Sequence, residues 1–241
     1  MIHPVIYTQA PSSDPALVAQ AACYGISDLH EALGGHGGRM TLMSPRMRPL
    51  CPRLRIAGRA ITAYNYPGDN LMMHKALHLA QPGDVLVVTN GGSAQGALWG
   101  ELAGTYAQTK KLGGIIVDGA IRDTDALAQM NFPVWYTSIS VCHPEKSALG
   151  AVNVPIVCDG VLVNPGDIVV ADADGVMVIP RQYLRAAVEG AKSRAEKEAG
   201  VRKKLRDGST LFDVFNGEAI LQASGISIRD CTWLDDEKSR N

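Results

Sequence analysis

The chain has 241 residues, a formal net charge of −1 and 46% hydrophobic residues, which is enough apolar material for a real core. This charge gives no overall field that would draw the chain to nucleic acid or to an acidic membrane. Five dispersed cysteines without a C-x-x-C pair argue against a disulfide framework and a thiolate zinc site, and they favour the reducing cytoplasm. Since the sequence has neither a signal-peptide pattern nor an apolar run of about 18 residues, we expect no export and no membrane span.

Two short helices, a loop and a strand are predicted at the start of the chain. Asp14-Pro15 places a capping residue before a proline at the first helical position, and predicts a helix through about Tyr24. A second helix is predicted over Ser27–Leu33. The proline-rich segment Pro45–Pro52 is predicted as a loop and Ile56–Tyr66 as a strand.

A basic segment overlaps this loop and strand. It has no Asp or Glu and contains Arg39, Arg46, Arg48, Arg53, Arg55 and Arg59. With only 5% aromatic residues, the chain lacks the stacking surface that proteins binding single-stranded nucleic acid use. We therefore expect a subunit contact or the entrance for an anionic small molecule, such as the distal carboxylates of a substrate, rather than nucleic acid.

A helix is predicted over Leu71–Leu79, with His74 and His78 four residues apart on one face. That spacing can ligate a metal, but the Glu of the H-E-x-x-H motif is replaced by Lys75. The zinc-protease interpretation therefore fails, and a structural pair of histidines is favoured.

A buried strand, Val85–Val88, leads into the glycine-rich stretch Asn90–Gly100 and then a helix predicted over Glu101–Leu112. The stretch matches neither G-x-G-x-x-G nor the P-loop, so it gives no support to nucleotide binding. Free N–H groups and the helix dipole nevertheless favour a carboxylate at such a helix N-terminus.

The stretch around Arg122 and Asp123 carries the main functional signal. Ile115–Val117 reads as a buried strand that Asp118-Gly119 closes with a turn, and Thr124 or Asp125 is predicted to cap a helix through Met130. Ligands of open α/β sheets bind beyond the carboxyl ends of strands, which is where this Arg-Asp pair falls. Taken alone, the pair also fits a solvated surface turn.

Beyond a strand at Val134–Thr137, residues 154–179 read as short strands joined by tight turns, one of them at Asp172-Ala173-Asp174-Gly175. A calcium loop is excluded there because its sixth and twelfth positions hold Met177 and Tyr183 instead of Gly and Glu. A long charged helix is predicted over Gln182–Arg206, followed by a frayed tail to residue 241. We expect a catalytic domain over residues 1–181 and a C-terminal helical extension over residues 182–241, packing on its own or a neighbouring subunit.

Five blocks in order and at plausible spacing carry a resemblance: Pro67–Leu77, Gly83–Val88, Trp99–Gly104, Gly113–Asp123 and Asn164–Pro180. They resemble the divalent-metal pyruvate aldolases that cleave 4-hydroxy-4-methyl-2-oxoglutarate and 4-carboxy-4-hydroxy-2-oxoadipate, in the superfamily of the ribonuclease E regulator RraA. The resemblance implies an α/β fold, a layered αββα sandwich of the RraA-like, swivelling β/β/α type. It also implies a homotrimer or homohexamer with active sites between subunits.

The same resemblance implies the roles of individual residues. Asp123 matches the direct ligand of Mg²⁺ or Mn²⁺, and Arg122 matches the residue that holds the substrate's keto oxygen. The loop whose backbone amides bind the pyruvyl carboxylate in this family matches Gly100, Glu101, Leu102 and Ala103. Glu198 matches a carboxylate that reaches the metal site of a neighbouring subunit. No organic cofactor is implied.

The chemistry of carbon–carbon cleavage fits these residue types independently. Cleavage beside a 2-keto group leaves an enolate, which a hard divalent cation and a guanidinium both stabilise. Our hypothesis is a cytoplasmic, metal-dependent aldolase of bacterial aromatic-acid breakdown that releases pyruvate and also decarboxylates oxaloacetate. The alternatives are an RraA-type protein that binds a ribonuclease without doing chemistry, and a dedicated oxaloacetate decarboxylase.

Overall fold

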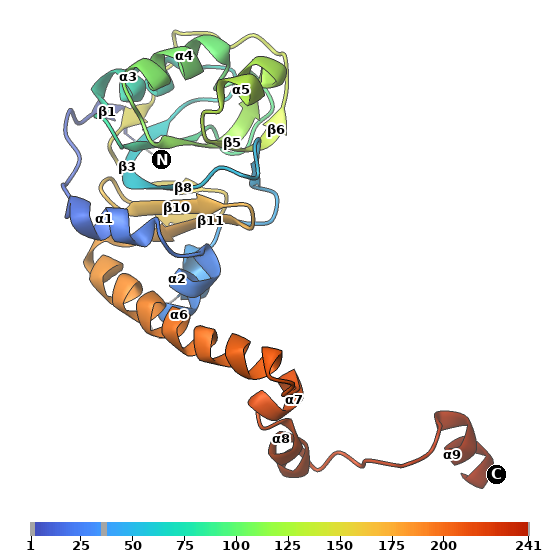
Figure 1. Cartoon of the computed structure of the whole chain (residues 1–241). Helices are drawn as coiled ribbons and strands as arrows, with labels where there is room; N and C mark the ends of the chain where they lie inside the picture. The colour runs from blue at the N-terminus through green and yellow to red at the C-terminus, as the bar shows by residue number, and fades with distance from the viewer. Residues whose placement is uncertain (1–2, 35–37, 241) are drawn as a thin grey trace. The chain divides into compact units, whose positions relative to one another are not determined.

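The computed structural model describes residues 3–34 and 38–240. The chain divides into two compact units, Met1–Arg194 and Ala195–Asn241, here called the core unit and the tail unit. The core unit is layered: helices cover one sheet, a second sheet lies behind the first, and further helices cover the second (Figure 1). The predicted αββα sandwich is therefore confirmed.

The first sheet has a parallel centre, in which β3, β4, β5 and β6 pair in sequence order. Such strands are apolar along their whole length because both faces are covered, and β4 and β5 are buried at every residue. Short strands at or near the two edges complete the first sheet. The order across the sheet is β1 (Val5–Ile6), β7 (Ala151–Val152), β3 (Ile56–Tyr64), β4 (Val85–Thr89), β5 (Gly114–Ile121), β6 (Val134–Ile139) and β2 (Arg48–Pro49).

Strand β3 belongs to both sheets and joins the two layers. Its first half pairs with β10 (Ile168–Asp172), which forms a hairpin with β11 (Gly175–Ile179), and its second half pairs with β4. A separate hairpin consists of β8 (Ile156–Cys158) and β9 (Val161–Val163). Apolar side chains of β3, β4, β8, β9 and β10 fill the space between the layers.

Helices cover both outer faces. The first sheet packs against α3 (Leu71–Leu79), α4 (Glu101–Thr109) and α5 (Thr124–Met130). The second packs against α1 (Pro15–Ala21), α2 (Ile26–Ala32) and the first turns of α6 (Leu184–Arg206). Short 3₁₀ segments lie at Gly38–Thr41 and Arg181–Tyr183.

Several sequence predictions are confirmed to the residue. Helix α3 has the predicted bounds, and the Asp14 side chain accepts a hydrogen bond from Ala16 N as the cap of α1. The turn after Asp172 joins β10 and β11 as a hairpin. Part of the predicted loop at Pro45–Pro52 is instead the edge strand β2, which pairs with β6.

The prediction of a turn at Asp118-Gly119 is wrong. Strand β5 runs on to Ile121, and its register with β6 shifts between Val117 and Ala120, as at a β-bulge. Gly119 has φ 157°, and a Cβ there would lie 2.7 Å from Leu98 Cδ1, so the position suits glycine alone. Buried Asp118 stays in the strand because its carboxylate accepts hydrogen bonds from Thr89 Oγ1 and Asp159 N.

The end of the chain is helical, which corrects the expected frayed tail. The tail unit contains the second half of α6, then α7 (Leu211–Val214), α8 (Gly217–Ser224) and α9 (Trp233–Arg240). A reciprocal capping box between Thr210 and Asp213 starts α7. None of the helices in the described ranges combines the length and apolar character needed to cross a bilayer.

Candidate functional site

A cavity of about 120 Å³ lies beyond the carboxyl ends of β4 and β5, where the sequence analysis placed a ligand site. It contains five of the seven residues to which the resemblance gave a role: Gly100, Leu102, Ala103, Arg122 and Asp123. The remaining lining residues come from α3, from the loop before α4 and from the segment after β6: Asn70, Met73, His74, Ala97, Leu98, Trp99, Pro144 and Lys146.

Backbone hydrogen bonds hold the glycine-rich loop against the end of β5. Leu98 N donates to Ala120 O at 2.8 Å, and Arg122 N donates to Trp99 O at 2.9 Å. The loop therefore continues alongside β5 like a further parallel strand, and it delivers Gly100 and the start of α4 next to Asp123.

Asp123 has an unusual backbone conformation, with φ 57° and ψ 38°. Left-handed backbone is uncommon outside glycine, although Asp tolerates it better than most residues, and it often marks functional sites. Asp123, rather than the expected Thr124 or Asp125, occupies the N-cap of α5, but its carboxylate makes no capping bond within the described chain. Instead Oδ2 accepts a hydrogen bond of 3.1 Å from Glu101 N, so the carboxylate faces the N-terminus of α4.

Arg122 extends beside this carboxylate, with its Nε 3.5 Å from Asp123 Oδ2. Its side chain is 35% exposed and that of Asp123 is 42% exposed, so both remain open to a ligand. Glu101 is not among the residues that line the cavity, and its backbone amide donates to Asp123.

His74 and Lys146 also line the cavity, although the sequence analysis gave neither a role there. His78, the other member of the predicted histidine pair, lies at the exposed end of α3. Burial lowers the pKa of His74, and the charge of Lys146 lowers it further while Asp69 opposes both. The imidazole is consequently neutral at neutral pH and able to accept a proton.

Asp69 explains why His74 and Lys146, which are far apart in the sequence, line the same cavity. Its buried carboxylate accepts hydrogen bonds from the amides of Leu71, Ser147 and Ala148 at 2.6 to 2.8 Å, which ties the start of α3 to the segment carrying Lys146. Burial acts to raise the pKa of Asp69, but these hydrogen bonds and the charge of Lys146 together lower it. Only the long-range pairing of these two segments reveals this arrangement.

Two buried polar atoms of the lining have no hydrogen-bond partner among the described residues: Asn70 Oδ1 and Trp99 Nε1. Asn70 is 6% exposed and Trp99 is 1% exposed. Buried polar groups are almost always paired in native proteins, so an unpaired acceptor and donor beside one cavity indicate a polar ligand or ordered water there.

The basic segment does not reach this cavity in the described structure. Arg46 pairs with Asp159 and Asp118, and Arg55 with Asp172. The side chain of Arg39 lies outside the described part. The expected role of this segment in binding distal carboxylates stays a prediction.

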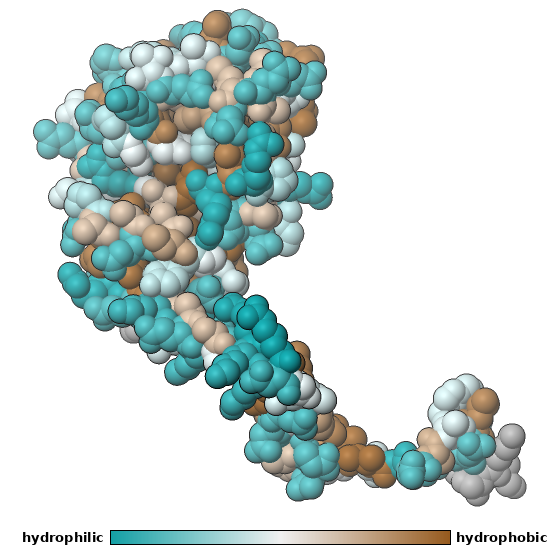
Figure 2. Space-filling view, viewed as in Figure 1, coloured by the Kyte–Doolittle hydropathy of each residue, from teal (hydrophilic) through white to brown (hydrophobic). Residues whose placement is uncertain are grey.

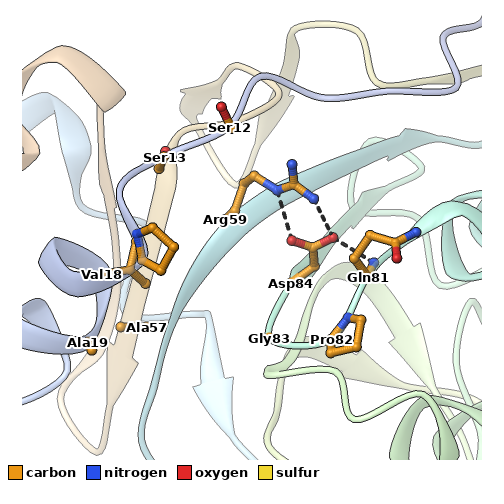
Figure 3. Close-up of a pocket in the computed structure, with 11 residues that line it drawn as sticks. Ser12, Ser13, Val18, Ala19, Ala57, Arg59, Gln81, Pro82, Gly83 and Asp84 are labelled. Carbon is orange, nitrogen blue, oxygen red and sulfur yellow. Dashed lines mark hydrogen bonds and ion pairs between the residues drawn. The ribbon is translucent and has the colours of Figure 1, made fainter.

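Arg59 lines a larger cavity, of about 480 Å³, which opens at the opposite end of β4 (Figure 3). There Arg59 Nε and a terminal nitrogen each lie 2.9 Å from a carboxylate oxygen of Asp84, and Asp84 also accepts from Gln81 N. The Arg59–Asp84 pair is closer and more buried, with side chains 23% and 5% exposed, which distinguishes it from the looser and more exposed pair at Arg122 and Asp123.

Glu198 lies in the tail unit, on the second half of α6, where it pairs with Arg202 at 2.7 Å. Its predicted place at the metal site of a neighbouring subunit stays a prediction.

These features describe an α/β sandwich protein with a small polar cavity at the ends of its parallel strands. The chain matches the RraA-like family model, described as Aldolase/RraA, over residues 26–178. It therefore belongs to the RraA-like family.

The chain is similar to a curated protein and to two solved structures. A protein of Halalkalibacterium halodurans, named "Putative 4-hydroxy-4-methyl-2-oxoglutarate aldolase", is 37% identical over 179 residues, covering 74% of this chain and 83% of that protein. The crystal structure of RraAS2 from Streptomyces coelicolor, described as an unusual member of the RNase ES inhibitor RraA family, is 30% identical. It has a TM-score of 0.74 and covers 80% of this chain and 99% of that chain. An uncharacterized protein of Pseudomonas syringae is 25% identical with a TM-score of 0.75, covering 84% and 98%.

Proposed function

We propose that the chain is a divalent-cation-dependent aldolase that releases pyruvate from a branched 4-hydroxy-2-oxo acid. Its substrates are 4-carboxy-4-hydroxy-2-oxoadipate, 4-hydroxy-4-methyl-2-oxoglutarate or both, in bacterial aromatic-acid breakdown in the cytoplasm. The observation that carries the proposal is the exposed Arg122 and Asp123 pair, facing the N-terminus of α4 in one cavity. The name of the Halalkalibacterium relative supports the same activity.

Arg122 stabilises the charge that develops on the substrate. Breaking the bond between C3 and C4 of such a substrate leaves electron density on the C2 oxygen of an enolate. A guanidinium keeps its charge at any working pH and offers fixed donors, so Arg122 is suited to that oxygen. Arg122 lines the same small cavity as the first turn of α4, which supports a binding mode in which the C2 oxygen and the neighbouring carboxylate of one substrate are bound together.

The first turn of α4 binds the substrate carboxylate. The first N–H groups of a helix lack intrahelical partners, and the helix dipole favours an anion there. Because Glu101 N already donates to Asp123, the next amides, of Leu102 and Ala103, are the ones assigned to the substrate. Asn70 Oδ1 and Trp99 Nε1 offer a further acceptor and donor to a polyoxygenated ligand.

The residues present fit a hard cation held by few protein atoms. In the described ranges, no group of three or more His, Cys, Asp or Glu side chains is arranged to hold a metal. The half-exposed carboxylate of Asp123 would hold Mg²⁺ or Mn²⁺ as a single protein ligand, since such an ion characteristically retains waters and takes remaining oxygens from the substrate. When bound, the cation supplies Lewis-acid stabilisation of the enolate.

His74 and Lys146 are placed to handle protons and charge at the distal side of the substrate. A neutral imidazole accepts a proton, such as that of the C4 hydroxyl, and the ammonium of Lys146 attracts a distal carboxylate. Since oxaloacetate loses CO₂ to give the same enolate, decarboxylation of oxaloacetate is a side activity of the proposed site.

A lactate-dehydrogenase-coupled assay tests the proposal. The purified chain is mixed with each branched hydroxy acid and with oxaloacetate, with Mg²⁺ or with EDTA. The proposal requires pyruvate release that depends on the cation and is faster for a branched acid than for oxaloacetate. Release from oxaloacetate alone would identify a dedicated decarboxylase instead.

The second candidate is an RraA-type binding protein that masks a ribonuclease, favoured by the likeness to the Streptomyces structure. It needs the fold but no chemistry at Arg122 and Asp123. Absence of pyruvate release from every substrate, together with inhibition of a ribonuclease E, would select this candidate. Both functions are compatible with the proposed homotrimer or homohexamer.

A further inference from the structure

A third cavity, of about 550 Å³, lies between α2 and the hairpin of β10 and β11, and is here called the α2 cavity. Its walls come from α2, from residues 42–45 and from residues 174–176. Among the described residues, none that lines it also lines the cavity at Arg122 and Asp123 or the cavity at Arg59. Its volume is within the ordinary range for small-molecule sites. The α2 cavity is therefore a separate candidate for a ligand.

Hydrogen bonds between distant segments hold the walls of the α2 cavity in place. Met43 N donates to Val176 O at 3.0 Å, which fixes residues 42–45 against β11. Ile26 N donates to Asp172 Oδ2 at 3.1 Å, which fixes the start of α2 to the end of β10. The walls are thus formed before a ligand arrives, and this lowers the cost of binding one.

Apolar side chains make up half of the lining. Ile26, Met43 and Val176 are buried, and Leu42 and Pro45 complete this apolar part. Figure 2 shows hydrophobic residues at the surface of the core unit around α1 and α2. Water finds few partners on such walls, so an apolar ligand that displaces it gains affinity.

The charge of the lining argues against carboxylate ligands, including the proposed substrates. No Lys or Arg is among the described lining residues, and the exposed carboxylate of Asp174 is their single formal charge. A carboxylate ligand would meet repulsion from Asp174 without a cation to offset it. The hydroxyl of Ser44 is already engaged, since it donates to Asp159 Oδ2 at 2.7 Å. The α2 cavity therefore suits an uncharged ligand.

His30 supplies the polar contact for such a ligand. It lines the α2 cavity, and its Nδ1 is buried without a hydrogen-bond partner in the described part of the chain. Buried polar atoms of native proteins are almost always paired, so a partner for Nδ1 is expected from a ligand. Nδ1 accepts or donates according to the tautomer of the ring, and a hydroxyl group complements it in either case.

We infer that the α2 cavity binds an uncharged aromatic compound that carries a hydroxyl group. The aromatic ring packs on the apolar wall, where the thioether of Met43 favours contact with such a ring, and the hydroxyl forms a hydrogen bond with His30 Nδ1. The inference is independent of the proposed enzymatic function, because the two cavities share no described lining residue.

Equilibrium dialysis of the full chain against three probes tests the chemistry of the ligand. 2-Naphthol, naphthalene and 2-naphthoate have the same rings, and at neutral pH they carry a hydroxyl, no polar group and a carboxylate. We expect the Kd of 2-naphthol to lie at least about fivefold below that of naphthalene, as one net hydrogen bond provides, and 2-naphthoate to bind most weakly. Equal Kd values for 2-naphthol and naphthalene, tighter binding of 2-naphthoate, or no binding of 2-naphthol would overturn the inference.

Substitution of His30 tests the polar contact. His30→Phe keeps a flat ring but removes Nδ1, so this variant should bind 2-naphthol no more tightly than naphthalene. The matched control His78→Phe, at an exposed position of α3, should bind both probes as wild type does. A folded His30→Phe variant that still prefers 2-naphthol as strongly as wild type would contradict the assigned contact.

A bulky side chain at Ser27 tests the location. Ser27 lines the α2 cavity from an exposed position of α2, so Ser27→Trp should fill the cavity without disturbing the core. The variant should bind 2-naphthol and naphthalene at least about tenfold more weakly, and its pyruvate release should equal that of wild type. Unchanged binding of both probes by folded Ser27→Trp would show that they bind elsewhere, and would overturn the inference.

Discussion

Gly100 leaves the space that the carboxylate of Asp123 occupies. A Cβ at position 100 would lie 2.6 Å from Asp123 Oδ2 and 3.1 Å from Arg122 Cγ. The backbone of Gly100, with φ −163° and ψ −174°, is extended and open to any residue, so contact with these two side chains is what demands glycine. The start of α4 can therefore lie this close to the end of β5 only because residue 100 has no Cβ.

Gly100→Ala should displace the Asp123 carboxylate and lower pyruvate release at least about tenfold, because misplacement of a catalytic group by a fraction of an ångström is costly. Its unfolding free energy should change little, since both side chains can move toward solvent. The matched control is Gly200→Ala in α6, where a Cβ would meet no described atom within 4 Å. That change should keep full activity and favour the helix by about 0.5 to 1 kcal/mol. Equal activity of the two variants would contradict the fit described here.

Asp69→Asn should destabilise the core unit at neutral pH. The carboxylate accepts three backbone hydrogen bonds, and replacing a charged acceptor by a neutral amide removes about 1.5 to 3 kcal/mol. The folded pKa of Asp69 is lowered, so its contribution is present above the unfolded pKa of about 3.9 and is lost as pH falls through the folded pKa.

Urea unfolding of wild type and Asp69→Asn between pH 3 and pH 7 measures the difference between their free energies of unfolding. This difference should be constant near pH 7 and should shrink near pH 3. Asp125→Asn, at an exposed position of α5, serves as the control and should follow wild type throughout. A difference between wild type and Asp69→Asn that grows as pH falls would have the wrong sign.

His74 should make the protein less stable in mild acid. Its folded pKa lies below the unfolded value of about 6.5, so the unfolded chain binds the proton first. The free energy of unfolding therefore declines as pH drops from about 6.5 toward the folded pKa. His74→Gln should remove this decline. NMR titration of the His74 imidazole provides a direct check, with a pKa below about 6.5 expected.

Local sequence was sufficient for much of the fold. The bounds of α3 follow from a turn before Leu71 and an apolar periodicity that ends at Leu79, and the hairpin after Asp172 follows from its turn residues. The cavity residues Arg122 and Asp123 were found because a buried run of β-branched residues locates the end of a strand.

The structural features that the sequence did not predict depend mainly on contacts between residues far apart in the chain. Asp118-Gly119 has the composition of a turn, but Thr89 of β4 and Asp159, just after β8, donate to Asp118 and keep it in the strand. His74 and Lys146 enter the site because Asp69 holds together segments separated by more than 70 residues, which no local pattern indicates. Helices α7, α8 and α9 have only four, eight and eight residues, so their periodicity was too weak to recognise.

The central claim is that Asp123 binds a divalent cation and that Arg122 stabilises the enolate beside it. The most direct test is the rate of pyruvate release with saturating Mg²⁺ for Asp123→Asn and Arg122→Ala, with Asp125→Asn as the control. Loss of the Arg122 donor removes about 3 kcal/mol of transition-state stabilisation, so the rate of Arg122→Ala should fall by a factor of about 100 or more. Asp123→Asn removes the charge that holds the cation and should also lose activity, while Asp125→Asn should match wild type. Full pyruvate release by either folded variant would contradict the account.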